Sequence, residues 1–183
     1  MKLEQTEYVV DWSYTEEGGK KLVVAATEEE GLVYVGGWDE PWDEFGNWAK
    51  RSYGKDVILQ EKPEAVAAYA TELLEYFAGQ RKSFTKRFAL RGTAFQRDVW
   101  EAMNRIPYGQ IASYADIASA LGKPQASRAV GTAIGQNPVL ILAPCHRIIG
   151  KNGSLTGYRG GLSMKRQLLE LEGALPIHVS LSE

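Results

Sequence analysis

The sequence is poor in the side chains that most often bind metals or form cross-links. Its 183 residues include one cysteine, Cys145, and two histidines. A single cysteine excludes an intramolecular disulfide, which suits a reducing compartment such as the cytoplasm. It also argues against a structural zinc site built from Cys and His. We therefore expect a cytoplasmic protein that uses neither a metal nor another cofactor.

Long apolar runs are also lacking. No stretch reaches the roughly 18 uninterrupted apolar residues that a membrane-spanning helix needs. The first ten residues, MKLEQTEYVV, carry acids where a signal peptide has a basic segment and then an apolar one. We expect neither a signal peptide nor a membrane span.

Negative charge gathers in one half of the chain and positive charge in the other. Residues 1–91 hold 12 Lys and Arg against 17 Asp and Glu, residues 92–175 hold 9 against 5, and Glu183 adds one acid. A basic half hints at an anionic partner for that half. Because many solvated surfaces differ this much, the asymmetry alone is weak evidence for nucleic acid.

The first half, residues 1–91, is predicted to be a strand-rich α/β domain. Segments 7–14, 21–27 and 31–38 are rich in Val, Tyr and Trp and are separated by glycine-containing turns, which favours strands. The stretch 38–48, WDEPWDEFGNW, contains Pro and Gly without a helical period, so we expect an acidic, tryptophan-rich loop of unassigned role. Residues 62–80 predict an amphipathic helix. Its apolar face would hold Val66, Tyr69, Ala70, Leu73, Leu74 and Phe77.

The second half, residues 92–183, is predicted to be mostly helical, after a domain boundary near residues 85–92. Thr93 and Ser113 are candidate N-caps of two helices, and Gly122 is a candidate C-terminal stop of the second. A further helix in 125–138 follows a short turn, so the pair matches a helix-turn-helix of the winged-helix-like kind. A last helix is expected near the segment SMKRQLLELEG.

The second helix of this helix-turn-helix is unusual for a DNA reader. Its core stripe would be Ala126, Val130 and Ile134. The opposite face carries Arg128, Gly131, Thr132 and Gly135. A major-groove reading helix usually offers several polar side chains to base edges, whereas this face is nearly bare. A bare helix can approach a surface closely, including a minor groove, but it can equally pack against another helix.

Cys145 lies in the stretch LAPCHRIIG, and two interpretations of it stay open. The commonest fate of a free cysteine is that of a small buried hydrophobe. Against this, His146 and Arg147 bring donor groups near the sulfur, which favours a reactive thiolate. The glycine-rich loop 150–161 could let backbone approach a ligand. If the segment is extended, neighbours point to opposite sides, so His146 would act through a water rather than by direct contact. Glu172 or Glu170 in the last helix could orient the imidazole.

The segments PYGQIASYADIASALG, SRAVGTAIGQNP and PCHRIIGKNGSLTGYRGG, in this order, closely resemble the O6-alkylguanine-DNA alkyltransferases. The resemblance covers about residues 92–173, and residues 1–91 match only in general character. It implies a DNA repair protein that flips O6-alkylguanine, and less well O4-alkylthymine, out of duplex DNA. The alkyl group is then transferred irreversibly to the protein's own cysteine, once per molecule. It also implies minor-groove binding with little sequence preference by a monomer.

The resemblance assigns catalytic roles to single residues. Cys145 of PCHR would accept the alkyl group, His146 would generate the thiolate through a water, and Glu172 of LEG would orient His146. Asn137 of QNP would join the helix-turn-helix to the active-site strand. Tyr114 of SY would lie in the base pocket, donate a hydrogen bond to the base and crowd the adjacent phosphate.

It likewise assigns binding roles. Arg128 of SRAVG would enter the duplex where the target nucleotide has left. Tyr158 and the backbone of Arg159, in GYRGG, would close the pocket over the base. Lys123 and Lys151 would lie where a phosphate backbone passes. Arg159 is bulkier than the residue of some members, which raises the question of pocket width, and the zinc ligands of some members' N-terminal domain have no counterpart here.

Three other functions remain to be separated from this one. An alkyltransferase-like binding protein flips damaged bases without transfer, but such proteins lack the cysteine of this motif. A DNA-binding regulator would need a helix face richer in base-reading side chains. A thiol hydrolase with a Cys-His-Glu set would turn over repeatedly.

Overall fold

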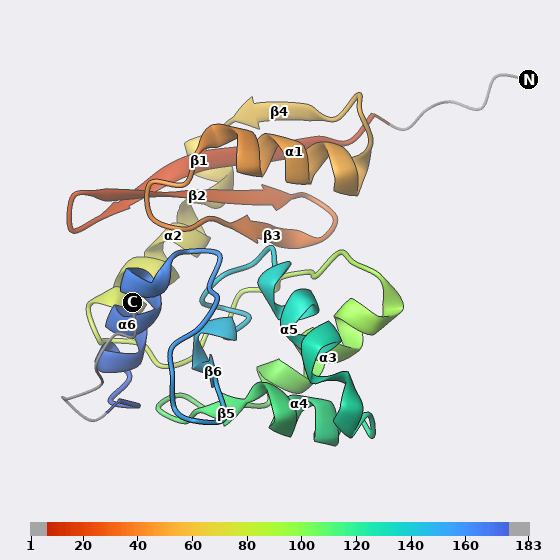
Figure 1. The fold of residues 1–183 in the computed structure, drawn as a ribbon. Coiled ribbons are helices and arrows are strands. Elements are labelled where there is room, and N and C mark those ends of the chain that lie inside the picture. The colour runs from red at the N-terminus through yellow and green to blue at the C-terminus, as the bar shows by residue number, and fades with distance from the viewer. Residues whose placement is uncertain (1–6, 176–183) are drawn as a thin grey trace, which may run out of the picture.

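The computed structural model describes residues 7–175. The first six residues, which belong to the segment where no signal peptide was expected, and Glu183 lie outside the described residues. A four-stranded sheet with two helices comes first, and helices with a two-stranded sheet follow (Figure 1). The expected fold class, a strand-rich α/β part followed by a mostly helical part, is confirmed. Among residues 7–175, no helix combines the length and the apolar character needed to cross a membrane.

The large sheet has the strand order β3-β2-β1-β4. Strands β1 (Val9–Glu17), β2 (Lys20–Thr27) and β3 (Gly31–Val35) form an antiparallel meander close to the predicted segments. Strand β4 (Ile58–Glu61) pairs in parallel with β1 at the edge. It was not predicted, because four residues that are mostly exposed carry too little alternation to mark a strand.

Both faces of the sheet are covered, as strand β2 shows. Leu22, Val24 and Ala26 join the core cluster that includes helix α2 (Pro63–Phe77), whereas Val23 and Ala25 join the cluster of helix α1 (Trp42–Tyr53). Alternate side chains of a strand point to opposite faces, so the two helices lie on opposite sides of the sheet (Figure 1). Burial on both faces explains why this strand is an unbroken apolar run.

Helix α1 overturns the loop predicted for residues 38–48. Phe45, Trp48 and Ala49 are buried at helical spacing against the sheet. Pro41 stands at the N-cap, where it begins a helix rather than breaking one, and Gly46 is tolerated inside. Pro and Gly are common loop signals, but Phe45, Trp48 and Ala49 repeat at the helical period on either side of Gly46.

Helix α2 forms where predicted, but one residue of its predicted apolar face is wrong. Leu74 is 41% exposed. The buried residues of the helix are Val66, Glu72, Leu73 and Tyr76. The face is therefore rotated toward Tyr76, whose side chain points into the second half of the molecule.

The second half contains α3 (Ala94–Asn104), α4 (Tyr114–Ala120), α5 (Ser127–Gly135) and α6 (Leu162–Leu171). Both predicted N-caps are confirmed. Thr93 and Ser113 each form a capping box, Thr93 with Gln96 and Ser113 with Asp116. Gly122 has a φ of 68°, as expected for a residue that ends α4.

Helix α5 is shorter than predicted. A single 3-10 turn, Pro124–Ala126, precedes it, so Ala126 lies before the helix and is only half-buried. The buried face of α5 consists of Val130, Ala133 and Ile134. Val130 and Ile134 of the expected packed face are therefore buried, and Ala133 takes the place of Ala126. Trp100 of α3 holds this face by donating a hydrogen bond to the Ala133 carbonyl at 2.8 Å.

The two halves share backbone contacts and one core cluster. Strand β3 pairs with the boundary segment at one end and with the second half at the other: Ala89 N–H donates to Leu32 O at 2.8 Å, and Val35 N–H donates to Pro138 O at 3.0 Å. The cluster runs from Leu22 in the sheet to Ile148 beside the cysteine. The predicted boundary near residues 85–92 lies between α2 and α3 and stays a prediction.

Candidate active site

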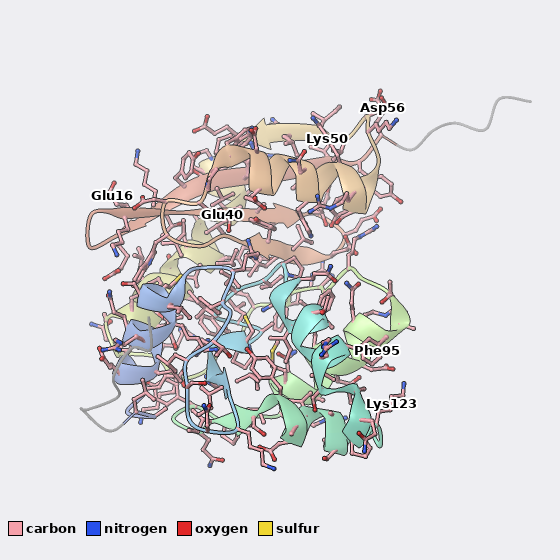
Figure 2. All side chains as sticks on the ribbon, viewed as in Figure 1. Glu16, Glu40, Lys50, Asp56, Phe95 and Lys123 are labelled. Atoms are coloured by element: carbon pink, nitrogen blue, oxygen red, sulfur yellow. The ribbon has the colours of Figure 1, made fainter. Side chains whose placement is uncertain are left out.

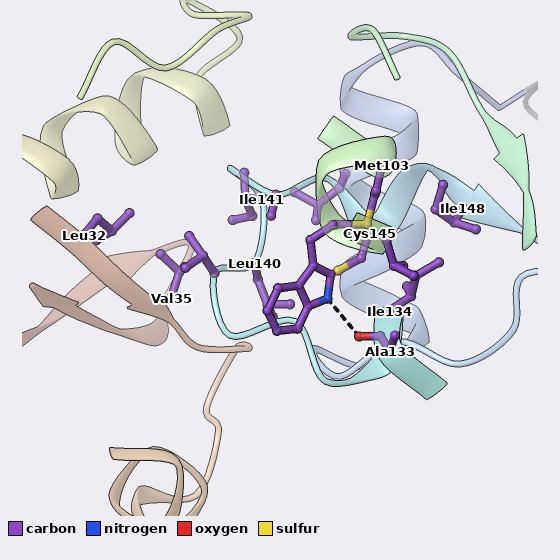
Figure 3. Packing of buried hydrophobic residues seen from close by; sticks show 14 of the residues in the cluster. Leu32, Val35, Met103, Ala133, Ile134, Leu140, Ile141, Cys145 and Ile148 are labelled. Atoms are coloured by element: carbon purple, nitrogen blue, oxygen red, sulfur yellow. Dashed lines mark hydrogen bonds between the residues drawn. The ribbon is translucent and has the colours of Figure 1, made fainter. Parts of the chain in front are cut away.

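Cys145 begins a 3-10 turn, Cys145–Arg147, and its side chain is buried at 3% exposure. Figure 3 shows it among apolar side chains that include Met103, Ile134 and Ile148. Burial raises the pKa of the thiol, and the Asn137 amide and the positive charges of Arg159 and Lys165 oppose this increase. The position combines the features of a core residue with those of a thiol held among donors.

Two successive γ-turns deliver the cysteine to this position. Ile141 has a φ of 74°, and the Leu142 N–H donates to Leu140 O across it at 2.9 Å. At Pro144 the Cys145 N–H donates to Ala143 O at 2.8 Å. A γ-turn with positive φ is rare, and a β-branched residue there is strained. Such a conformation persists only when the surrounding structure imposes it.

Asn137 supplies part of that constraint. Its Nδ2 donates to Ala143 O at 2.9 Å and to Cys145 Sγ at 3.1 Å, while its Oδ1 accepts from the Val139 N–H at 3.0 Å. The side chain, fully buried, therefore spans the turn from end to end. Since Asn137 follows α5 closely, it links the helix-turn-helix to the cysteine, although the linked segment is a turn and not a strand.

His146 makes no direct hydrogen bond to the Cys145 sulfur in the described part of the chain. Its Nε2 lies 2.9 Å from Glu172 Oε1, and its Nδ1 is buried with no hydrogen-bond partner among residues 7–175. Burial lowers the pKa of His146, and the hydrogen bond with Glu172 opposes this decrease. The extended conformation from which indirect action was predicted is wrong, because residues 145–147 form a turn.

The Glu172 carboxylate is surrounded by donors. Arg147 donates to both of its oxygens at 2.9 Å, Gly109 N–H donates to Oε2 at 3.1 Å, and Tyr76 Oη donates to Oε1 at 2.6 Å. Burial alone would raise the pKa of Glu172, but the hydrogen bonds of His146 and Arg147 outweigh it and hold the pKa far below its usual range. The other candidate, Glu170, is exposed.

Two tyrosines flank the region on the side of the loop 150–161. Tyr114, the first residue of α4, donates from its hydroxyl to Thr156 O at 3.2 Å. A Cβ on Gly131 would lie 3.6 Å from its ring, so α5 packs directly on this tyrosine. The Tyr158 hydroxyl is buried without a hydrogen-bond partner in the described part of the chain, and burial raises its pKa.

The side chain of Arg159 lies between the two halves of the molecule. Its guanidinium points to the first half of the molecule, where it bonds Glu40, Tyr34 and the Val35 carbonyl. The bulk of Arg159 is therefore directed toward Glu40 and β3.

The predicted DNA contacts lie apart from this cluster, on the surface. Arg128 is exposed on α5, and a Cβ on Gly135 would meet nothing within 4 Å. Lys123 is exposed at the start of the turn before α5, with its ammonium 5.2 Å from the centre of the Phe95 ring (Figure 2). Lys151 is exposed in the loop 150–161.

The sequence left three residues of the site unassigned. Tyr76 reaches it from α2, and its place on a helical stripe beside Leu73 was the available signal. The sequence suggested Arg147 only as a donor group near the sulfur, whereas in the structure it donates to both oxygens of Glu172. Lys165 is fully buried, donates to Ile148 O at 2.5 Å and to Thr156 O at 2.9 Å, and has its pKa lowered by burial to about 8.

Comparisons with known proteins show which family the chain is similar to. Residues 94–174 match the family described as 6-O-methylguanine DNA methyltransferase, DNA binding domain. The chain is 50% identical over 147 residues to an inducible methylated-DNA--protein-cysteine methyltransferase of Bacillus subtilis, covering 80% of this chain and 82% of the relative. It is 44% identical to a methylated-DNA--protein-cysteine methyltransferase of Methanosarcina acetivorans, covering 83% and 92%. Among solved structures, OGT of Mycobacterium tuberculosis in complex with DNA is 37% identical, with a TM-score of 0.73 and coverage of 91% and 93%.

Proposed function

The chain belongs to the 6-O-methylguanine DNA methyltransferase family, and we propose that Cys145 is the residue that accepts the alkyl group. The protein repairs DNA by taking the group from guanine O6, and less well from thymine O4, once per molecule. One observation carries the assignment of Cys145: the chain's only cysteine sits against Asn137 with a buried His146–Glu172 pair beside it.

His146 acts as the base for the thiol. With Nε2 bonded to a carboxylate whose pKa is depressed, the proton of the neutral ring belongs on Nε2, which leaves Nδ1 as the acceptor. A water between Sγ and Nδ1 then carries the thiol proton to the ring. Glu172 fixes the ring and stabilises the imidazolium that forms, as the carboxylate of a catalytic triad does.

The transfer is a displacement at the alkyl carbon. The S–C bond forms as the bond from carbon to O6 breaks, and the electron pair goes to the base, which takes up a proton. The Tyr114 hydroxyl donates its hydrogen bond to the base in place of its bond to Thr156 O, and this stabilises the charge that develops on the base. Tyr158 and the backbone of Arg159 close the pocket. The product is a thioether, which water does not hydrolyse as it would a thioester, so the protein is used up.

Guanine O6 is buried in the base stack, so the target nucleotide must be flipped out. Arg128, exposed on the bare face of α5, fills the space that the nucleotide leaves. The small residues of that face, Gly135 among them, allow close approach to a minor groove. Lys123 and Lys151 contact phosphates. Such contacts position the protein on DNA without reading its sequence. The protein acts in this way as a monomer in the cytoplasm.

The test uses a duplex that carries a labelled methyl group on guanine O6. Wild-type protein should gain one methyl group, located on Cys145 by mass spectrometry of its peptides, and Cys145→Ala should gain none. The Ala variant should bind DNA within a few-fold of wild type. A protein that binds without acquiring label would be a regulator or a non-transferring binder, and repeated turnover would indicate a hydrolase.

A further inference from the structure

The guanidinium of Arg159 joins three separate parts of the chain. Nη1 donates to Glu40 Oε2 at 2.5 Å and to Tyr34 Oη at 2.7 Å, both in the first half. Nη2 donates to Val35 O at 2.8 Å and to Pro138 O at 3.2 Å, and Nε donates to Asn137 O at 3.1 Å. A planar fork of five N–H groups fits such a set of acceptors, whereas a lysine ammonium does not.

Glu40 is itself held in place. Its carboxylate accepts from the Tyr34 hydroxyl and, at 3.0 Å, from the Gly37 N–H. The side chains of Glu40 and Arg159 are only 6% and 18% exposed. A buried ion pair is weak evidence for stability, because removing both charges from water costs about as much as their attraction returns. The pair is better explained by what it holds in position.

Arg159 holds the carbonyl end of the strained turn that leads to the cysteine. Asn137 O and Pro138 O stand at the start of the segment that reaches Cys145 through the γ-turn at Ile141. Asn137 thus accepts from Arg159 with its backbone carbonyl and donates to Cys145 Sγ with its side-chain amide. A shift of the Asn137 backbone would therefore move a direct partner of the sulfur.

The loop around Arg159 is packed against the first half with no spare room. A Cβ on Gly37 would lie 2.7 Å from the Gly160 Cα, which real structures do not allow. Residues 36–40 and 157–161 thus lie in backbone contact, with Glu40 and Arg159 bonded across them (Figure 2 labels Glu40 between the sheet and the lower half).

We infer that Arg159, anchored by Glu40, is a positioning residue for alkyl transfer: it fixes the Asn137–Pro138 backbone and the loop that carries Tyr158. The inference rests on the proposed function of Cys145. The Arg159 side chain makes no hydrogen bond to the sulfur, and its partners on the cysteine side are Asn137 O and Pro138 O, so it acts through Asn137 and through the turn. A residue of the sheet half, Glu40, then sets the reactivity of a cysteine in the other half.

The experiment compares full-length Glu40→Gln, Arg159→Gln, Arg159→Lys and the double variant Glu40→Gln/Arg159→Gln with wild type. Single-turnover methyl transfer from a duplex should slow by roughly tenfold in each Gln variant, since small displacements of reacting groups cost this much or more. Arg159→Lys should recover part of the rate. The double variant should be no slower than Arg159→Gln, because the two side chains act as one unit.

Two further readouts separate positioning from other roles. The dissociation constant for the duplex should change less than twofold, and transfer from a free O6-alkylguanine base should slow as much as transfer from the duplex. The exposed pair Glu101 and Arg105 is the matched control, and Glu101→Gln and Arg105→Lys should leave every quantity unchanged. Glu40→Gln alters neither chain length nor side-chain size, so it serves even if an Arg159 variant folds poorly.

Hydrogen exchange tests the same inference without methyl transfer. In Glu40→Gln and Arg159→Gln, amides of residues 139–145 should exchange faster, while those of β2 stay as in wild type. If wild type transfers no methyl group, the proposed function fails, and the exchange data still decide whether Arg159 holds the turn. Four outcomes would each overturn the inference. Two concern the rates: transfer within twofold of wild type, or single-variant effects that multiply in the double variant. The other two are unchanged exchange at residues 139–145 and a duplex affinity that falls as far as the rate.

Discussion

Tyr76 Oη and Glu172 Oε1 lie 2.6 Å apart, although the tyrosine belongs to the helix behind the sheet and the glutamate follows the last helix. The same oxygen accepts from His146 and Arg147. The orienting carboxylate of the site is therefore completed from the first half of the chain.

Tyr76→Phe should lower stability more than it lowers activity. The variant loses one buried hydrogen bond to a charged acceptor, which contributes on the order of 1.5–3 kcal/mol. His146 and Arg147 still hold Glu172, so the single-turnover rate should stay within a few-fold of wild type. Urea unfolding gives the first quantity, and methyl transfer gives the second. A rate loss beyond tenfold at unchanged stability would make Tyr76 part of the proton path.

Stability should fall on both sides of neutral pH. His146 and Glu172 have folded-state pKa values below their ordinary values of 6.5 and 4.5, so each stabilises the fold above its unfolded pKa. That contribution is lost as pH falls, first below 6.5 and then below 4.5. On the alkaline side, the raised pKa values of Cys145, Tyr76 and Tyr158 mean that their contributions are lost as pH rises above 9.0 and then 10.0. These losses outnumber the opposite effect of Lys165, whose pKa is lowered to about 8 from 10.5. Urea midpoints measured against pH should show this dome.

His146→Gln is the control for the acid side of that dome. Without the buried imidazole, the fall in the urea midpoint between pH 7 and pH 5 should flatten, while the fall below 4.5 remains. An unchanged slope would mean that other groups cause the loss.

Arg128→Ala should separate base flipping from chemistry. Arg128 lies on the exposed face of α5, opposite the buried Val130 and Ile134, so its removal should leave the fold intact. Losing its insertion should cost on the order of 1–3 kcal/mol, the scale of unstacking a base. Repair of duplex DNA should then slow by roughly tenfold or more. A free alkylated guanine needs no flipping, so its reaction should be nearly unchanged. Equal losses on both substrates would place Arg128 in the pocket or the fold.

Binding to DNA should depend on salt and hardly at all on sequence. The exposed cations Lys123, Arg128 and Lys151 offer phosphate contacts, and the bare face of α5 offers few base contacts. Titrations of unrelated duplexes over a series of salt concentrations should give similar affinities with a common slope. A preference of several kcal/mol for one duplex would point to a regulator.

Local chemistry made much of the fold predictable. Thr93 and Ser113 mark helix starts because a hydroxyl followed three residues later by Gln or Asp closes a capping box. The apolar run of β2 and the helix-turn-helix follow from periodicity. Helix α1 was not predicted, because Pro41 and Gly46 usually mark loops, whereas here Phe45, Trp48 and Ala49 carry a helical period.

The site was predictable only as far as resemblance reached. The identities of Cys145, His146 and Glu172 followed from the motif, and the structure brings His146 and Glu172 into hydrogen-bond contact. The γ-turn at Ile141 could not be foreseen, since its conformation is imposed by tertiary contacts on a residue that disfavours it. The direction of Arg159 was equally unpredictable, because its partners Tyr34 and Glu40 lie more than a hundred residues earlier in the chain.

The separation of charge between the two halves gives the molecule an electric dipole. The half with excess acid forms the sheet, and the half with excess base carries α3, α4 and α5 away from it (Figure 1). Near a polyanion such as DNA, this dipole experiences a torque that turns α5 toward the polyanion. The effect extends over about one Debye length, which is roughly 8 Å at physiological salt. The protein is therefore oriented with α5 toward the DNA before the two touch. When the acidic half approaches the DNA first, repulsion shortens the encounter.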